Sequence, residues 1–221
     1  MTSVSRSLES GRRLRLTLEC AALFVGLPVV MAVAVSPYRM RDVFIGATVV
    51  ALVLLIFTPG FRWRSLVEGP ILREWRAILL FTLVTMGISA ALVLWLSPER
   101  FLAMPRHMTE LWLRIMIWYP FLSALPQEII YRVLFFERYG PLFPGRRWAI
   151  AANAACFGLA HLFYLNWPAV LLTTLGGVVF AWAYAGRRSF GLAFLLHMLG
   201  GQIIFTFGLG IYFYHGAIGA V

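Results

Sequence analysis

The chain has 221 residues, of which 61% are hydrophobic and only 13% are charged. This composition, together with apolar runs of about 20 residues, excludes a water-soluble globular enzyme, a disordered chain and a disulfide-stapled secreted domain. The net charge of +10 would fit nucleic-acid binding, but the arginines gather between apolar segments, so we expect them to set membrane topology, with no nucleic-acid partner.

Seven segments are apolar and long enough to be expected as membrane helices. In chain order they cover residues 16–35, 43–57, 77–96, 111–136, 148–165, 168–185 and 190–212. The fourth contains Pro120 and Pro126, so it is either one kinked helix or a span followed by a separate helix. The predicted fold class is all-α, a polytopic transmembrane bundle of about seven to eight helices.

The arginines between these segments predict how the chain crosses the membrane. Counted on alternate sides, 13 lie on the side of the N-terminus and 4 on the other, while Arg114 and Arg132 lie inside the fourth segment. The positive-inside rule then places the N-terminus in the cytoplasm. We expect the first apolar segment to remain as an uncleaved helix, because it is longer than the 7–15 residues of a signal-peptide core.

Few polar side chains lie deep in the apolar segments, and those that do usually face the bundle interior and serve a function. Glu128 and Arg132 are spaced i, i+4, which lets them pair on one side of a helix. Glu137, beside Arg138, is about half a turn out of phase with Glu128 and is expected at the solvated end. The other deep side chains are Asn153, Phe157 and His161, at spacing i, i+4, i+8, and His197 with Gln202.

Glu128, His161 and His197 lie at similar depth. Counted from the nearest cytoplasmic arginine they are 10, 14 and 9 residues into their helices, or roughly 14–21 Å at 1.5 Å per residue. A carboxylate that accepts a proton, two imidazoles that donate to an oxyanion and an arginine that orients the carboxylate are the parts of water-mediated hydrolysis. A structural Glu–Arg ion pair with interhelical histidine hydrogen bonds is the alternative interpretation.

Three short motifs in the C-terminal half resemble those of a known family. They read Gln127-Glu128-Ile129-Ile130-Tyr131-Arg132, Phe157-Gly158-Leu159-Ala160-His161 and His197-Met198-Leu199-Gly200-Gly201. Their order, spacing and membrane context resemble the CPBP family, the CAAX-protease and bacteriocin-processing group also called Abi, which includes the type II CAAX prenyl endopeptidases. The resemblance covers about residues 122–202 and implies an intramembrane endopeptidase, in a multi-pass protein of the bacterial inner membrane.

Two positions depart from the family's usual Glu-Glu-x-x-x-Arg, Phe-x-x-x-His and His-x-x-x-Asn. Gln127 stands at the first glutamate and Gly201 at the asparagine. In the family the first glutamate is thought to activate water, while the histidines and the asparagine hold the water and the oxyanion. The base's role would pass here to Glu128, because an amide does not take up a proton near neutral pH. Gln202 or Asn153 could supply the missing amide, although their spacing differs from the motif.

These features divide the chain into four parts. We expect a cytoplasmic Arg-rich N-terminus (1–15), N-terminal transmembrane helices (16–110), a CPBP-like catalytic core (111–212) and a short tail (213–221). The leading hypothesis is an endopeptidase that needs no cofactor and cuts a membrane-associated or lipidated protein or peptide near the cytoplasmic side of the bilayer.

Three other hypotheses fit the same side chains. In the first, Glu128, His161 and His197 hold zinc, since two histidines and one glutamate form the ligand set of a catalytic zinc site. In the second, Gln127 and Gly201 mark a catalytically inactive relative that acts as a membrane binding or immunity partner. In the third, the buried acid, arginine and histidines are the proton relay of a transporter.

Overall fold

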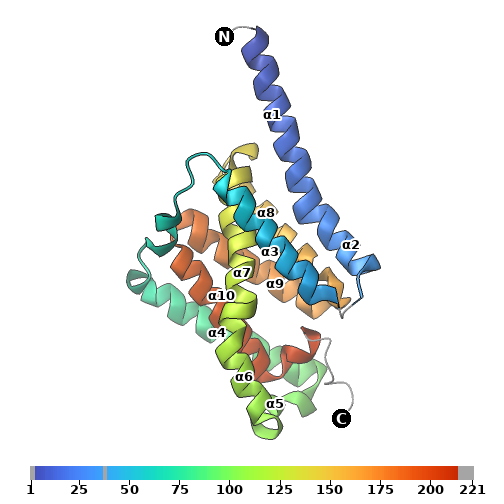
Figure 1. The fold of residues 1–221 in the computed structure, drawn as a ribbon. Helices are drawn as coiled ribbons and strands as arrows, with labels where there is room; N and C mark the ends of the chain where they lie inside the picture. The colour runs from blue at the N-terminus through green and yellow to red at the C-terminus, as the bar shows by residue number, and fades with distance from the viewer. Residues whose placement is uncertain (1–2, 37–38, 214–221) are drawn as a thin grey trace. The chain divides into compact units, whose positions relative to one another are not determined.

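The structure is a computed structural model that describes residues 3–36 and 39–213, with side chains from Glu9 onward. The regular elements of these residues are helices and none is a strand, which confirms the predicted all-α fold (Figure 1). The α-helices are α1 (Ser3–Ala21), α2 (Leu27–Ala34), α3 (Met40–Ile56), α4 (Trp75–Leu96), α5 (Ala103–His107), α6 (Thr109–Tyr119), α7 (Leu125–Glu128), α8 (Arg146–Ala160), α9 (Trp167–Ala181) and α10 (Phe190–Phe207).

In the described part of the chain, four helices are long and apolar enough to cross a membrane. They are Glu9–Ala34, Leu72–Leu96, Trp167–Gly186 and Phe190–Phe207. The other predicted segments are also largely helical: α3 and α8 are shorter, at 17 and 15 residues, and the segment 111–136 carries three charged side chains. Many large apolar side chains are exposed, as expected for helices whose outer faces contact lipid.

The motif region contains π-helical turns. The chain is helical without a break from Thr109 to Tyr139, because π-helical segments at Pro120–Ala124 and Ile129–Tyr139 flank α7. Pro120 has no N–H to donate, and local π geometry is one way in which a membrane helix satisfies the carbonyls that a proline frees. The structure thus favours one continuous helical stretch over a span followed by a separate motif helix.

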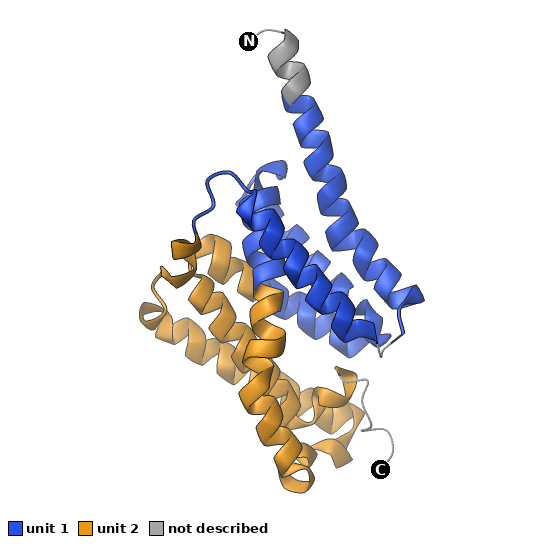
Figure 2. Cartoon of the chain, in the orientation of Figure 1, with its two compact units in different colours: residues 1–62, 129–178 blue, residues 63–128, 179–221 orange. Residues whose placement is uncertain are grey.

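The chain forms two compact units, which are described separately (Figure 2). Unit 1 comprises residues 1–62 and 129–178, and unit 2 comprises residues 63–128 and 179–221. Each unit is therefore built from two stretches of the chain. The part boundaries predicted at residues 15, 110 and 212 stay predictions, and the predicted tail 213–221 lies outside the described residues except for Phe213.

In unit 1, Phe24 joins the N-terminal helices to the stretch Ile129–Tyr139. Its side chain is buried, and its ring lies edge-on to Tyr131, Phe135 and Tyr139, with ring centroids 5.2–5.7 Å away. These three rings are four residues apart and so form one stripe along the helical stretch. The stretch Ile129–Tyr139 is thereby packed against residues near the N-terminus.

In unit 2, small residues fix the start and middle of α10. Ser189 caps the helix by accepting a hydrogen bond from Leu192 N at 3.2 Å. Gly69, at φ +117°, lies so close that a Cβ there would be 2.7 Å from Ser189 Oγ, and a Cβ at Gly200 would be 3.2 Å from Phe81 Cζ. Gly200 thus lets α4 and α10 approach closely.

Loss of the cap on α10 should destabilise unit 2. Ser189→Ala removes the side-chain acceptor for Leu192 N, and such a loss typically costs about 1 kcal/mol of unfolding free energy. We expect a lower midpoint of thermal unfolding for the purified protein in detergent. A variant that unfolds together with the wild type would contradict the capping role.

Candidate active site

The first and third motifs meet in unit 2 through a carboxylate and an imidazole. Glu128 ends α7 and His197 lies in the middle of α10, and Glu128 Oε1 is 2.8 Å from His197 Nδ1. Both side chains are buried, with exposed fractions of 0% and 5%. Burial strengthens the interaction because water does not screen it. A carboxylate is thus held directly against an imidazole ring, away from bulk water.

Two aromatic rings fix the orientation of the His197 imidazole. Phe180 stacks on it, with centroids 4.8 Å apart and planes inclined by 11°. Tyr119 approaches edge-on, at 6.2 Å and 71°. Since Nδ1 is committed to Glu128, this packing sets the direction of the other ring nitrogen, Nε2, as well.

Gly201 lies four residues beyond His197, on the same face of α10. A Cβ at this position would overlap Cζ and Oη of Tyr119, at the end of α6. The Tyr119 ring also lies edge-on to Phe205, with centroids 5.8 Å apart. A tyrosine therefore fills the place that an asparagine side chain would take in the family motif. The sequence shows only that the asparagine side chain of the family motif is missing at Gly201. The spacing of the motifs does not predict that Tyr119 lies there.

The two other amides predicted for this region have partners of their own. Gln127 Nε2 donates to Ser123 Oγ at 2.9 Å, one turn earlier on the same helical stretch. Gln202 Nε2 donates to the carbonyl of Met116 at 2.9 Å and so ties α10 to α6. Gln202 thus links two helices, a structural contact that sequence spacing alone did not predict.

Arg132 lies at the centre of a buried cluster in unit 1. Its Nη1 donates to Asn153 Oδ1 at 2.7 Å, and its guanidinium lies 4.5 Å from the centroid of the Phe157 ring. Asn153 in turn donates through Nδ2 to the carbonyl of Tyr131. Arg132 and Asn153 are both 0% exposed. The Asn153 amide thus uses both its oxygen and its nitrogen to bind the stretch Ile129–Tyr139. Asn153 therefore orients this stretch and is a poor replacement for the amide missing at Gly201.

His161 follows the same stripe at the end of α8. Its Nδ1 is 2.8 Å from the carbonyl oxygen of Phe157, and its ring lies edge-on to that of Phe157, 4.8 Å between centroids. A carbonyl only accepts hydrogen bonds, so Nδ1 carries the proton, and Nε2 of the neutral ring is an acceptor. In this tautomer His161 would orient a water molecule by accepting from it, whereas donation to an oxyanion would need the imidazolium form.

The predicted residues are thus divided between the two units. Glu128, His197, Gln127, Gly201 and Gln202 belong to unit 2, and Arg132, Asn153, Phe157 and His161 belong to unit 1. The common layer of Glu128, His161 and His197 stays a prediction. No three His, Cys, Asp or Glu side chains within the described ranges are grouped as ligands of a metal ion, and the zinc hypothesis likewise stays a prediction.

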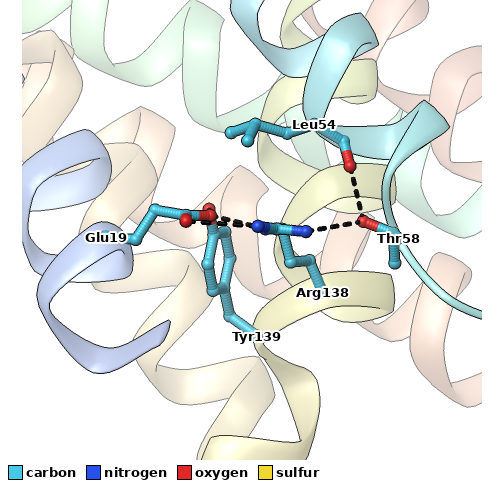
Figure 3. Close-up of polar contacts among 5 residues, drawn as sticks. All are labelled: Glu19, Leu54, Thr58, Arg138 and Tyr139. Atoms are coloured by element: carbon cyan, nitrogen blue, oxygen red, sulfur yellow. Dashed lines mark hydrogen bonds and ion pairs between the residues drawn. The ribbon is translucent and has the colours of Figure 1, made fainter. Parts of the chain in front are cut away.

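Figure 3 shows a polar cluster in unit 1 that was not predicted. Arg138 donates from Nε and Nη2 to the two carboxylate oxygens of Glu19, at 2.5 and 3.1 Å, and from Nη1 to Thr58 Oγ1 at 3.3 Å. Tyr139 donates its hydroxyl to Glu19 Oε1 at 2.6 Å. Arg138 is predicted to lie in a connecting segment, as one of the 13 arginines on the cytoplasmic side, but its side chain is only 10% exposed. The available signal was an acidic residue inside the first apolar segment.

Comparison with known proteins agrees with the three motifs. The family model described as "Type II CAAX prenyl endopeptidase Rce1-like" matches residues 109–203, the stretch that carries all three. No curated protein and no solved structure matches the chain. With its apolar helices the chain is an integral membrane protein. Residues 109–203 are therefore similar to the Rce1-like type II CAAX prenyl endopeptidases, in agreement with the resemblance of the three motifs.

Proposed function

We propose that this protein is an intramembrane endopeptidase that hydrolyses a peptide bond in a membrane-associated or lipidated protein or peptide. The buried contact between Glu128 and His197 carries the proposal, because it holds a carboxylate and an imidazole together away from bulk water. The Rce1-like match over residues 109–203 supports the reaction class. Turnover by the purified protein in proteoliposomes, on a quenched-fluorescent peptide ending in a farnesylated CAAX sequence, tests the proposal, with the unprenylated peptide alongside.

In the proposed reaction Glu128 accepts a proton from a water molecule while His197, held at Oε1, stabilises the carboxylate. The hydroxide adds to the substrate carbonyl carbon and gives a tetrahedral oxyanion. The C–N bond then breaks, and the proton taken from water ends on the leaving amine. His161 would orient the water through Nε2, which is the acceptor of its neutral ring. We propose that no metal takes part, so a chelator should leave the rate unchanged.

A second candidate function, that of an inactive relative, is favoured by one observation. Gln127, at the first glutamate of the family motif, donates its amide to Ser123 Oγ, a role that an ionised glutamate could not fill. This protein would then bind a membrane partner without cutting it. The two candidates predict different results for the same substitution.

Gln127→Glu separates the two candidates. If Glu128 is the base, the wild type cuts the peptide, Gln127→Ala lowers the rate only a few-fold through positioning, and Gln127→Glu leaves it intact or raises it. We expect this pattern in kcat from the proteoliposome assay. Should the wild type be inert while Gln127→Glu turns over, the inactive-relative function replaces the one proposed here.

The orientation proposed for the membrane has its own test. A reporter fused after Arg188 should be cytoplasmic and one fused after Arg106 should lie on the opposite side, because 13 arginines against 4 set the topology. Paired alkaline phosphatase and fluorescent-protein fusions measure this in intact cells. If both sites report from one side, the proposed number of crossings between them is wrong.

A further inference from the structure

Tyr119 and His197 approach the same face of α10 in unit 2. The Tyr119 ring is edge-on to the His197 ring, and its Oη and Cζ lie where a side chain at Gly201 would begin. His197 and Gly201 are four residues apart, which is about 6 Å along a helix. The tyrosine hydroxyl thereby lies against α10 one turn beyond the backbone position of His197, whose imidazole contacts Glu128.

The hydroxyl adds a hydrogen-bond donor to this face of α10. A phenylalanine ring would fill the space above Gly201 as well as a tyrosine ring, whereas the phenol adds an O–H donor. A neutral donor on the helix face that carries His197 suits an oxyanion, whose charge develops only in the transition state.

We propose that Tyr119 donates a hydrogen bond from Oη to the oxyanion formed during peptide hydrolysis, in place of the side chain that Gly201 lacks. This role rests on the proposed function. No bond to Tyr119 forms or breaks: its proton stays on Oη while the negative charge appears on the substrate oxygen and then disappears as the C–N bond breaks. Glycine at position 201 is needed because any Cβ there would displace the tyrosine ring.

Removal of the hydroxyl alone tests the role. In proteoliposomes with the quenched-fluorescent farnesylated CAAX peptide, Tyr119→Phe should lower kcat by about 10²-fold, as loss of one oxyanion donor does elsewhere, with KM changed by less than about threefold. Tyr212→Phe is the matched control, since it removes a hydroxyl of the same unit that lies 3.4 Å from Ser97 Oγ. The control should keep the wild-type kcat.

A size exchange between positions 119 and 201 provides the rescue. Gly201→Asn alone should fall in activity, because its Cβ overlaps the Tyr119 ring. Tyr119→Ala should be as slow as Tyr119→Phe or slower. The double variant Tyr119→Ala/Gly201→Asn should have a kcat at least about tenfold above that of Tyr119→Ala, because the alanine leaves space for the asparagine side chain and its amide supplies the hydrogen-bond donor.

The outcomes separate this inference from the proposed function. A wild type that cuts the peptide and a Tyr119→Phe variant with equal kcat would overturn the role of Tyr119 and leave the proposed function standing. A wild type indistinguishable from Glu128→Gln would contradict the proposed function, and the role of Tyr119 with it. Melting temperatures of all variants in detergent show whether a lost rate reflects lost folding: Tyr119→Phe should melt within a few degrees of the wild type.

Discussion

Glu128→Gln should abolish peptide hydrolysis while leaving the protein folded. The substitution keeps the size of the side chain and an oxygen that can accept from His197 Nδ1, but the amide does not take up a proton from water. General-base catalysis typically contributes 10²–10⁴-fold, so we expect kcat to fall by about 10³-fold or below detection. The measurement is initial-rate kinetics of the purified variant in proteoliposomes, on the quenched-fluorescent farnesylated CAAX peptide.

Glu137→Gln is the matched control for this loss. Glu137 is exposed on the same helical stretch, so the same chemical change there should leave kcat unchanged. Melting temperatures of both variants should stay close to that of the wild type. Hydrolysis that continues at the wild-type rate in Glu128→Gln would exclude this carboxylate as the base, whether or not a metal assists.

Asn153→Leu should have the largest effect on stability. Asn153 Oδ1 accepts from Arg132 Nη1 at 2.7 Å, and both side chains are 0% exposed. Leucine has nearly the same size but offers no acceptor, so a buried guanidinium loses a hydrogen bond away from water. We expect the free energy of unfolding to fall by about 3 kcal/mol, a loss that denaturant titration in detergent would detect.

Two further variants show whether this loss of unfolding free energy comes from the contact with Arg132. Asn153→Asp keeps an acceptor for Arg132 and should recover much of the stability. Asn166→Leu removes an asparagine of unit 1 that caps the start of α9, with Oδ1 2.9 Å from Ala169 N, and should cost only about 1 kcal/mol. Equal losses in Asn153→Leu and Asn166→Leu would show that the Arg132 contact contributes little.

Local features of the site could be predicted from sequence because they follow helical spacing. Asn153, Phe157 and His161 were placed on one stripe at i, i+4, i+8, and the structure links Asn153 and Phe157 to Arg132, and Phe157 to His161. Glu128 and His197 are predicted at similar depth, and their side chains are in contact. Rare polar residues in apolar helices carry this information, since each must find a partner inside the protein.

Contacts between distant helices could not be predicted in the same way. A helix that is apolar all round shows no periodic face, so its pattern does not say which neighbour it packs against. The approach of Tyr119 to Gly201 and the bonds from Arg138 to Glu19 both join segments far apart in the sequence. For the same reason, a composition profile does not show that each unit is formed from two separate stretches of the chain.

The central claim is that Glu128 and His197 act as one unit on the attacking water, and a double-mutant cycle in kcat/KM tests it most directly. Glu128→Gln, His197→Gln and the double variant are compared with the wild type in proteoliposomes on the same farnesylated peptide. The effects of substituting residues that act together are strongly non-additive, so we predict that the double variant is no slower than the slower single variant. Single-variant losses that multiply in the double variant, or a wild-type rate in either single variant, would contradict the account.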